Sequence, residues 1–222
     1  MIITILFWII GTLLISSTSA IIAKKYGPEY IIGIFVGCIV IANVLANKIV
    51  VFLNFTVPAG VIVYATTFLL TDMLSEFYGK KEAKKAVWSG FLANIILVFS
   101  VWIAINWTPA SFWENQDAFV KVLGMTPRIV LANLVAYIVS QNHDVWAYHL
   151  WKNKTKDRHL WLRNNASTIV SQLIDSSIFI TIAFMGVFPV LPLIIGQFVI
   201  KVIIALLDTP FLYAIKYYYN KK

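Results

Sequence analysis

Seven long apolar stretches dominate this sequence and leave little chain for anything else. They cover about residues 1–23, 30–50, 56–75, 86–106, 128–150, 166–188 and 191–218. A helix needs roughly 20 apolar residues to cross a hydrocarbon core of about 30 Å, so each stretch is long enough to span a bilayer. Only 13% of the residues are charged, whereas soluble domains carry about 25%. The sequence therefore predicts an all-α integral membrane protein of about seven transmembrane helices, folded as a single domain over residues 1–222.

The first stretch has the length of a signal peptide and ends in the small residues Ser16 to Ala20. A signal peptide carries its basic region ahead of the apolar run, whereas here Lys24 and Lys25 come after it. We therefore expect a retained helix at about 1–23, followed by a six-helix unit at about 30–218.

Basic residues divide unequally between the two sides of such a protein. If alternate loops are assigned to opposite sides, fourteen of the 18 Lys and Arg residues fall on one side and three on the other, with Lys201 inside the seventh stretch. Basic loops stay in the cytoplasm during insertion. This predicts a multi-pass protein of the cell (inner or plasma) membrane, with its N-terminus outside and its C-terminus in the cytoplasm. The net charge of +8 then requires no nucleic-acid partner.

Two further features concern local structure. Small residues recur four apart in the second stretch, at Gly33 and Gly37 and again at Ala42 and Ala46, which predicts close approach of a neighbouring helix. The one long outer loop, at about 107–127, is rich in aromatic residues and predicts a short interfacial helix.

Polar residues at membrane depth mark the place to look for function, because each is costly unless it faces a partner or a wet cavity. The candidate substrate-binding residues are Asn43, Asp72, Glu76, Asn133, Gln141, Asp144, Gln172, Asp175 and Lys201. At about 1.5 Å per residue, Asp175 and Lys201 both fall near the bilayer midplane, so Lys201 should pair with Asp175 or Asp208. The alternative is that these residues only join helices by hydrogen bonds, and Glu76 could simply pair with Lys80.

Two short patterns recur on helices of opposite direction. A-N-x-x-A occurs at residues 42–46 and 132–136, and S-Q-x-x-D at residues 140–144 and 171–175. They indicate a 3+3 inverted repeat of stretches two to four and five to seven, with the site between the halves. Because five-residue matches also arise by chance, the repeat stays an open alternative.

The motifs of enzymes and nucleotide-driven pumps are missing from this sequence. It has no phosphate-binding glycine loop, no G-x-S-x-G and no H-E-x-x-H, and Cys38 is its single cysteine. We predict no enzyme activity, no cofactor and no metal site. A carboxylate can accept both N–H groups of a guanine-like edge, and Gln or Asn can donate to its carbonyl. The same residues could also bind a polar vitamin or a cation.

Several ordered motifs resemble one family. The segment TDMLSEFYG at residues 71–79 resembles the T-D-x-x-x-E-x-[YF]-G signature of the queuosine-precursor transporters, also called the vitamin uptake transporter family. Residues 141–144, 161–175 and the last stretch, with Lys201 and Pro210, are similar to that family too. The resemblance covers about residues 30–218. It implies a six-helix inner-membrane importer of 7-deazaguanine bases that carry a cyano or aminomethyl group, to which the helix at 1–23 adds a seventh.

The resemblance also implies roles for the candidate residues. Asp144 and Asp175 would bind the N–H edge of the base, and Gln141 and Gln172 would donate to its carbonyl side. Lys201 would hold a carboxylate in place or couple transport to protons. The remaining contributors would be Asn43, Asp72, Glu76 and Asn133. The expected partners are the purine-like base and the lipid bilayer, with a homo-oligomer left open.

Two alternative functions remain at this point. The chain could be the substrate-capture subunit of an energy-coupling-factor vitamin transporter, in which Ala42-x-x-x-Ala46 would dock a partner and an ATPase module would drive uptake. It could also be a membrane enzyme or a structural membrane subunit. Co-isolation of an ATPase would favour the substrate-capture subunit. Turnover of a bound base would favour the enzyme, and the absence of any binding in binding assays would favour the structural subunit.

Overall fold

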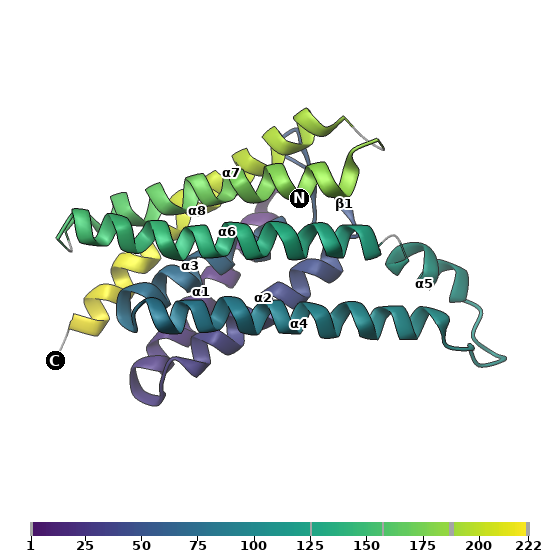
Figure 1. The fold of residues 1–222 in the computed structure, drawn as a ribbon, viewed down its shortest axis with the longest axis horizontal. Helices are drawn as coiled ribbons and strands as arrows, with labels where there is room; N and C mark the ends of the chain where they lie inside the picture. Colours follow the sequence, from purple (N-terminus) through teal and green to yellow (C-terminus); the bar gives the residue numbers. More distant parts are fainter. Residues whose placement is uncertain (1, 125, 157, 187–188, 221–222) are drawn as a thin grey trace.

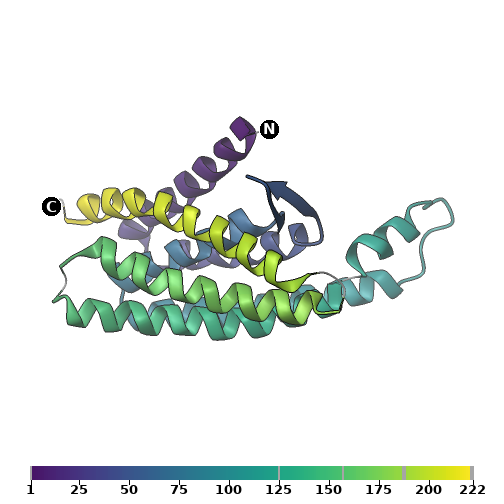
Figure 2. The ribbon, with the colours of Figure 1, turned by 90° about the horizontal axis from the view of Figure 1, so that it is seen from above.

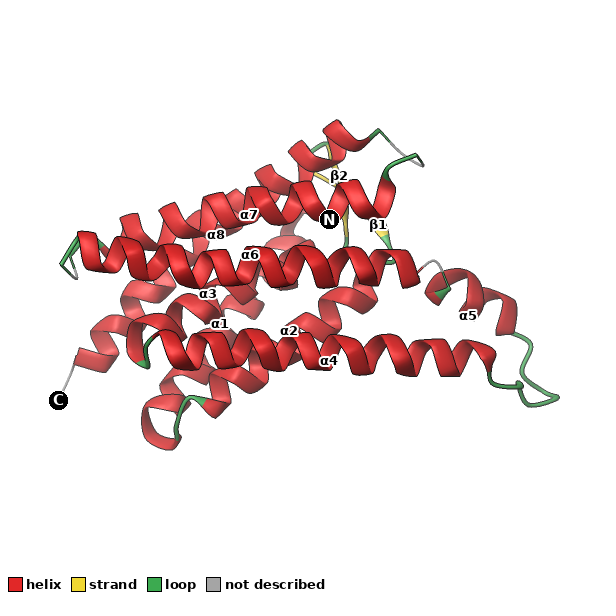
Figure 3. Ribbon diagram, in the orientation of Figure 1, coloured by secondary structure: helices red, strands yellow, loops and turns green. Residues whose placement is uncertain are grey.

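The computed structural model describes residues 2–124, 126–156, 158–186 and 189–220, so the lysines at 221 and 222 lie outside it. These residues form eight helices and one two-stranded hairpin (Figures 1 and 3). In chain order the elements are α1 (Ile2–Tyr26), α2 (Glu29–Leu45), β1 (Ile49–Phe52), β2 (Phe55–Pro58), α3 (Val61–Phe77), α4 (Lys80–Asn106), α5 (Gln116–Leu123), α6 (Thr126–Lys154), α7 (Leu160–Phe184) and α8 (Val190–Asn220).

Five helical segments are long and apolar enough to cross a membrane. They are Ile3–Tyr26, Lys80–Asn106, Gln116–Lys154 (which takes in α5 and α6), Leu160–Phe184 and Val190–Asn220. This confirms a helical, multi-pass membrane protein. The helices α2 and α3 have 17 residues each, or about 25 Å at 1.5 Å per residue, which is less than the thickness of the hydrocarbon core.

A β-hairpin separates α2 from α3, so the predicted helix boundaries at 30–50 and 56–75 are wrong. The two strands are antiparallel, with Phe52 opposite Phe55. Between them, Leu53 and Asn54 have φ angles of 48° and 65°, the left-handed backbone that a type I′ turn requires. The strands, IVVF and FTVP, are rich in the β-branched and aromatic residues that favour extended structure. The apolar composition of this segment is therefore compatible with strands as well as helices, and the turn at Leu53 and Asn54 favours strands.

Helix α3 lies in the middle of the bundle. Its residues from Val61 to Ser75 are all buried, and α1, α2, α4, α6, α7 and α8 all contact it. Its polar side chains, among them Thr71 and Asp72, are therefore inside, whereas large apolar side chains such as Phe99 and Trp102 of α4 are exposed. Polar groups inside and apolar groups outside are what a protein surrounded by lipid requires.

The basic loops gather at one end of the bundle, together with the end of α8 (Figure 1, left). There the Lys24 ammonium donates to the carbonyl oxygen of Tyr218 at 2.8 Å. The Glu76 carboxylate lies 2.6 Å from Nζ of Lys216 and 3.4 Å from Nζ of Lys152. The ends of α1, α3, α6 and α8 thus meet, as the alternate assignment of loops predicts.

At the opposite end, α5 projects beyond the bundle (Figure 2). It occupies residues 116–123 of the predicted loop at 107–127, and none of its residues is buried. The prediction of a short helix in this loop is confirmed.

The small residues of α2 do not all act as predicted. Nothing lies within 4 Å of a Cβ built on Gly33 or Gly37, because both face an open groove between α1 and α2. The close approach predicted at these glycines is therefore wrong. It occurs instead at Ala42, whose carbonyl oxygen would lie 2.2 Å from a Cβ built on Gly60 at the start of α3.

We expect Gly60→Ala to destabilise the protein by about 1–3 kcal/mol, the usual cost of forcing extra volume into a packed interior. Unfolding in detergent can be followed with a thiol-reactive dye, because the single cysteine, Cys38, is buried and reacts only when the structure opens. Gly33→Ala is the matched control, since it introduces the same methyl group into open space. Equal melting temperatures for the two variants would show that the contact at Gly60 is not tight.

Candidate functional site

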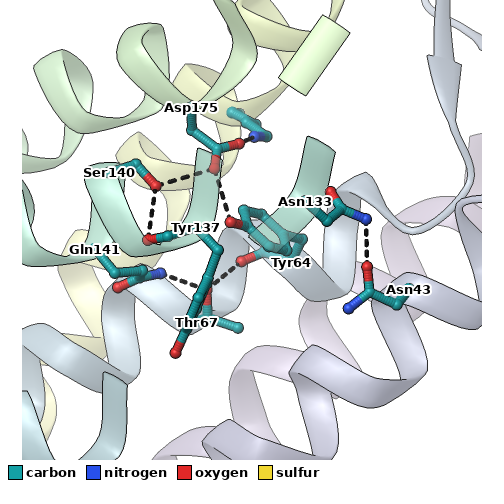
Figure 4. Close-up of polar contacts among 9 residues, drawn as sticks. Asn43, Tyr64, Thr67, Asn133, Tyr137, Ser140, Gln141 and Asp175 are labelled. Atoms are coloured by element: carbon teal, nitrogen blue, oxygen red, sulfur yellow. Dashed lines mark hydrogen bonds and ion pairs between the residues drawn. The ribbon is translucent and has the colours of Figure 1, made fainter. Parts of the chain in front are cut away.

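A buried ion pair lies where four helices meet. Lys201 of α8 donates to Oδ2 of Asp175 of α7, and neither residue is more than 2% exposed. Oδ1 of the same carboxylate accepts hydrogen bonds from the hydroxyls of Tyr64 of α3, at 2.7 Å, and Ser140 of α6, at 3.0 Å (Figure 4). The Lys201 ammonium also lies 4.7 Å from the centroid of the Tyr64 ring, within cation–π range.

The surroundings of this pair compensate for its burial. Two charges removed from water recover the lost hydration only where their geometry is good and further hydrogen bonds satisfy the remaining atoms. Besides the ion pair itself, Asp175 accepts two such bonds, from the hydroxyls of Tyr64 on α3 and Ser140 on α6. The sequence predicts either Asp175 or Asp208 as the partner of Lys201, and the structure selects Asp175.

Three asparagine side chains form a second polar group, on the hairpin side of the ion pair. Nδ2 of Asn133 donates to Oδ1 of Asn43 (Figure 4), and Nδ2 of Asn43 donates to Oδ1 of Asn94 at 2.6 Å. All three are buried. This row joins α6, α2 and α4, so Asn43 and Asn133 do link helices, as the alternative interpretation of the polar residues predicts.

A small cavity brings the ion pair and the asparagines together. It has a volume of about 30 Å³ and lies under the hairpin, against Pro58 and Gly60. Its polar lining consists of Asn43, Tyr64, Asn133, Asp175, Gln197 and Lys201. A space of this size holds about one water molecule. The cavity as it stands is therefore too small for a heterocyclic base.

The two predicted glutamines differ in their surroundings. Gln141 is held by α3, since its Nε2 donates to Thr67 at 3.0 Å and its Oε1 accepts from Thr71 at 3.4 Å. Gln172 is fully buried, yet neither atom of its amide has a hydrogen-bond partner among the described residues. Gln141 is thus fixed by the scaffold, whereas Gln172 retains its full hydrogen-bonding capacity.

The other predicted carboxylates lie farther toward the basic end. Asp72 accepts a hydrogen bond from Thr168 at 3.2 Å, and Asp144 accepts one from Thr71 at 3.3 Å. Thr168 precedes Asp175 by seven residues on α7, so this region lies about 10 Å from the ion pair along the helix. The predicted site residues therefore lie at two depths in the bundle. Asp175 and Lys201 lie at one depth, and Asp72 and Asp144 lie nearer the basic end.

Glu76 belongs to neither depth. Its carboxylate lies at the basic end of the bundle, bound to Lys216 and Lys152, and accepts a hydrogen bond from Tyr148 at 3.0 Å. The alternative pairing with Lys80 is not the one observed. Glu76 thus joins α3 to α6 and α8 where the basic loops meet.

Sequence reasoning missed Tyr64 as a member of the polar core. Tyr64 precedes Thr67 by three residues and Thr71 by seven, so the three follow the helical spacing that identified the other stripes. That signal was available, but a single Tyr within an apolar run resembles an ordinary packing residue.

Comparisons with known proteins agree on one family. The family model described as "Putative vitamin uptake transporter" matches residues 58–215. A Bacillus subtilis (strain 168) protein named "Probable queuosine precursor transporter" is 37% identical over 217 residues, which cover 95% of this chain and 93% of the relative. The "Queuosine precursor transporter" of Escherichia coli (strain K12) is 24% identical over 143 residues, which cover 64% of this chain and 62% of the relative. No solved structure matches the chain.

The matched residues 58–215 include the TDMLSEFYG motif of α3, the ion pair of Asp175 and Lys201, and Asn133 of the asparagine row. The family model covers well over half of the chain, and the Bacillus subtilis relative extends the similarity to nearly all of it. This chain belongs to the vitamin uptake transporter family.

Proposed function

We propose that this protein imports queuosine precursors, namely 7-deazaguanine bases that carry a cyano or aminomethyl group. The observation that carries the proposal is the ion pair of Asp175 and Lys201, buried beside a cavity that two asparagine amides also line. The names of both relatives support the substrate class.

The chemistry of the base suits these groups. Its guanine-like edge presents neighbouring N–H donors, which one carboxylate accepts together. Asp175 offers Oδ1 for this purpose once the base displaces the hydroxyls of Tyr64 and Ser140, while Lys201 keeps Oδ2. Asn43 and Asn133 are then available to the carbonyl and ring nitrogen, and the Tyr64 ring can stack on the base.

The other predicted residues take supporting roles in this proposal. Gln172 supplies an amide to the base as it passes inward, because its own hydrogen bonds are unmade. Gln141 positions α6 against α3 through Thr67 and Thr71. Glu76 anchors the basic end. The carboxylates of Asp72 and Asp144 act nearer that end.

Transport requires the cavity to widen. A volume of about 30 Å³ cannot admit a bicyclic base, so the described arrangement corresponds to a closed state. Pro58, the last residue of β2, lines the cavity beside Gly60 at the start of α3, and the hairpin also touches α8 at Gly196. Movement of this hairpin away from α8 is the simplest route by which the base enters.

The proposed topology has seven spans, with α2 and α3 each crossing in 17 residues and the hairpin on the outer side. The basic end then faces the cytoplasm and the N-terminus faces outward. An inverted 3+3 repeat is supported by the contact of Asn43 with Asn133, which occupy equivalent places in the A-N-x-x-A pattern of α2 and α6. The S-Q-x-x-D pattern relates α6 to α7, two helices of the same half, and does not bear on the repeat.

The energy-coupling-factor alternative is weakened by the position of Ala42 and Ala46. Both are buried and line the internal cavity, so they do not offer an outward surface to a partner subunit. Uptake that fails without a co-expressed ATPase module would revive this alternative.

The test is uptake in a bacterium that can neither make nor import the precursor. We expect expression of this chain to restore the modified nucleoside in tRNA when nanomolar cyano or aminomethyl base is supplied. Asn133→Ala should reduce the rate about tenfold, because loss of one buried hydrogen-bonding group costs about 1.4 kcal/mol. Asn142→Ala, on the same helix, is the control, since among the described residues the side chain of Asn142 bonds to the backbone carbonyl of Ile138. A membrane-inserted protein that restores nothing would refute import of these bases.

A further inference from the structure

Three buried carboxylates occupy the half of the bundle nearer the basic end, and we refer to them as the inner carboxylate group. They are Asp72 of α3, Asp144 of α6 and Asp208 of α8, each at most 1% exposed. Thr168 and Asn164, one helical turn apart on α7, donate to Asp72 at 3.2 Å and to Asp208 at 3.3 Å, and Thr71, the sequence neighbour of Asp72, donates to Asp144 at 3.3 Å. Three acidic side chains from three helices thus lie near one short stretch of α7.

No described Lys, Arg or His side chain forms an ion pair with any member of this group. The described lysines that are not exposed are all paired elsewhere: Lys201 with Asp175 on the outer side, and Lys152 and Lys216 with Glu76 on the inner side. The other titratable groups of these helices near this level are His143, which shares a hydrogen bond with Ser171, and His149, which lies near Lys152, Lys80 and Glu76. Three unpaired negative charges at this depth would be very costly.

Hydrogen-bond donors are also in short supply here. Oδ1 of Asp72, Oδ1 of Asp144 and Oδ1 of Asn164 are buried acceptors without a donor among the described residues. Asn164 is in direct contact with the group, since its Nδ2 donates to Asp208 at 3.3 Å. Gln172 lies one helical turn beyond Thr168, the donor to Asp72, and both atoms of its buried amide are unpartnered. Of the atoms just named, four acceptors therefore lack a donor, whereas one donor, Nε2 of Gln172, lacks an acceptor.

A bound proton meets both needs, because it removes one negative charge and turns a carboxylate oxygen into a donor. A shared metal ion fits less well. In the described part of the chain, no three His, Cys, Asp or Glu side chains are placed to hold one.

We propose that the inner carboxylate group binds protons and couples their movement to import of the base. A hydronium ion that reaches the group from the outer side gives one proton to a carboxylate oxygen and leaves as water. On the cytoplasmic side the resulting carboxylic acid returns that proton to water. This inference rests on the proposed import function, and Asp175 remains the contact for the base. The connection runs through Gln141. Its Oε1 and a carboxylate oxygen of Asp144 lie 3.4 Å and 3.3 Å from the same Thr71 hydroxyl, and its sequence neighbour Ser140 donates to Asp175.

The first experiment uses the full chain in liposomes with radiolabelled cyano-deazaguanine. An acid-outside gradient of about one pH unit, with the membrane potential clamped, should raise accumulation up to about tenfold for each coupled proton. Asp208→Asn should lose this gain while still binding the base at equilibrium, and Asp144→Asn and Asp72→Asn should lose the gain as well. Asp117→Asn, the same change on the exposed helix α5, should keep it. If the wild-type protein accumulates the base equally with and without the pH gradient, proton coupling is refuted.

A second measurement does not depend on the substrate. Infrared difference spectra of the purified protein between acid and alkaline pH should contain the carbonyl band of a protonated carboxylic acid. That band should be reduced in the folded Asp144→Asn and Asp72→Asn variants and unchanged in Asp117→Asn. If the wild-type protein takes up no base but this pattern is present, import of the base is refuted while the proton site stands. If the variants leave the band unchanged, the proton site is refuted whatever the substrate.

Discussion

Replacing Asp175 with asparagine should reduce uptake of the base at least a hundredfold. The substitution leaves the Lys201 ammonium buried without its counter-charge, and breaking a buried pair in this way typically costs about 3–5 kcal/mol. It also removes the charge that we propose accepts the N–H edge of the base. A loss of about 3 kcal/mol in binding alone corresponds to more than a hundredfold in affinity. Binding to purified protein and uptake into liposomes should therefore fall together.

A double variant separates the two contributions. Asp175→Asn with Lys201→Met removes both charges, so we expect the melting temperature to recover most of what the single variant loses. Base binding should not recover, because the carboxylate is still missing. If the double variant binds the base as the wild type does, Asp175 holds Lys201 in place and has no direct part in recognition.

Locking the hairpin to α8 should stop transport reversibly. A Cβ built on Gly196 lies 3.3 Å from Cβ of Phe55, close to the separation of about 3.5–4.5 Å found in disulfides. In a Cys38→Ser background, Phe55→Cys with Gly196→Cys should form a disulfide on oxidation. Because the cavity under the hairpin is too small for the base, uptake should fall about a hundredfold, as expected when one conformation is held at the expense of the other. A reducing agent should restore it.

Each single-cysteine variant under the same oxidant is the control for this experiment. Equal uptake by the oxidised and reduced double variants, with the disulfide verified by mass, would mean that the base enters without movement of the hairpin. The base would then have to reach Asp175 by passing between two helices.

The sequence was sufficient for the features that depend on composition and charge. Apolar length predicted α4, α6, α7 and α8 to within a few residues of one end or the other, and the basic loops lie together as their alternation predicted. The cost of an isolated charge at that depth predicted a carboxylate partner for Lys201, either Asp175 or Asp208, and Asp175 is the one observed. These features depend on how each stretch interacts with lipid or water, so each stretch can be assessed without knowing what the others pack against.

Other features depend on contacts between distant parts of the chain. The hairpin results from a two-residue turn at Leu53 and Asn54 within an apolar run, where hydropathy does not distinguish strand from helix. The division of the polar residues into two depths was also hidden. Asp144 and Asp175 have the same local S-Q-x-x-D pattern, yet only Asp175 meets a lysine, because that lysine comes from α8. A local pattern carries no information on which helix packs against it.

The contacts between α1 and α8 have a consequence for how the protein is made. The hydroxyl of Tyr219 donates to the carbonyl oxygen of Ala20 at 2.7 Å, and the Lys24 ammonium donates to that of Tyr218. Because α8 is synthesised after the other seven helices, α1 cannot be seated by these bonds until nearly the whole chain has left the ribosome. Until then α1 packs mainly against α2 and α3, the helices that follow it in the chain. The last helix to be made therefore completes the packing of the first.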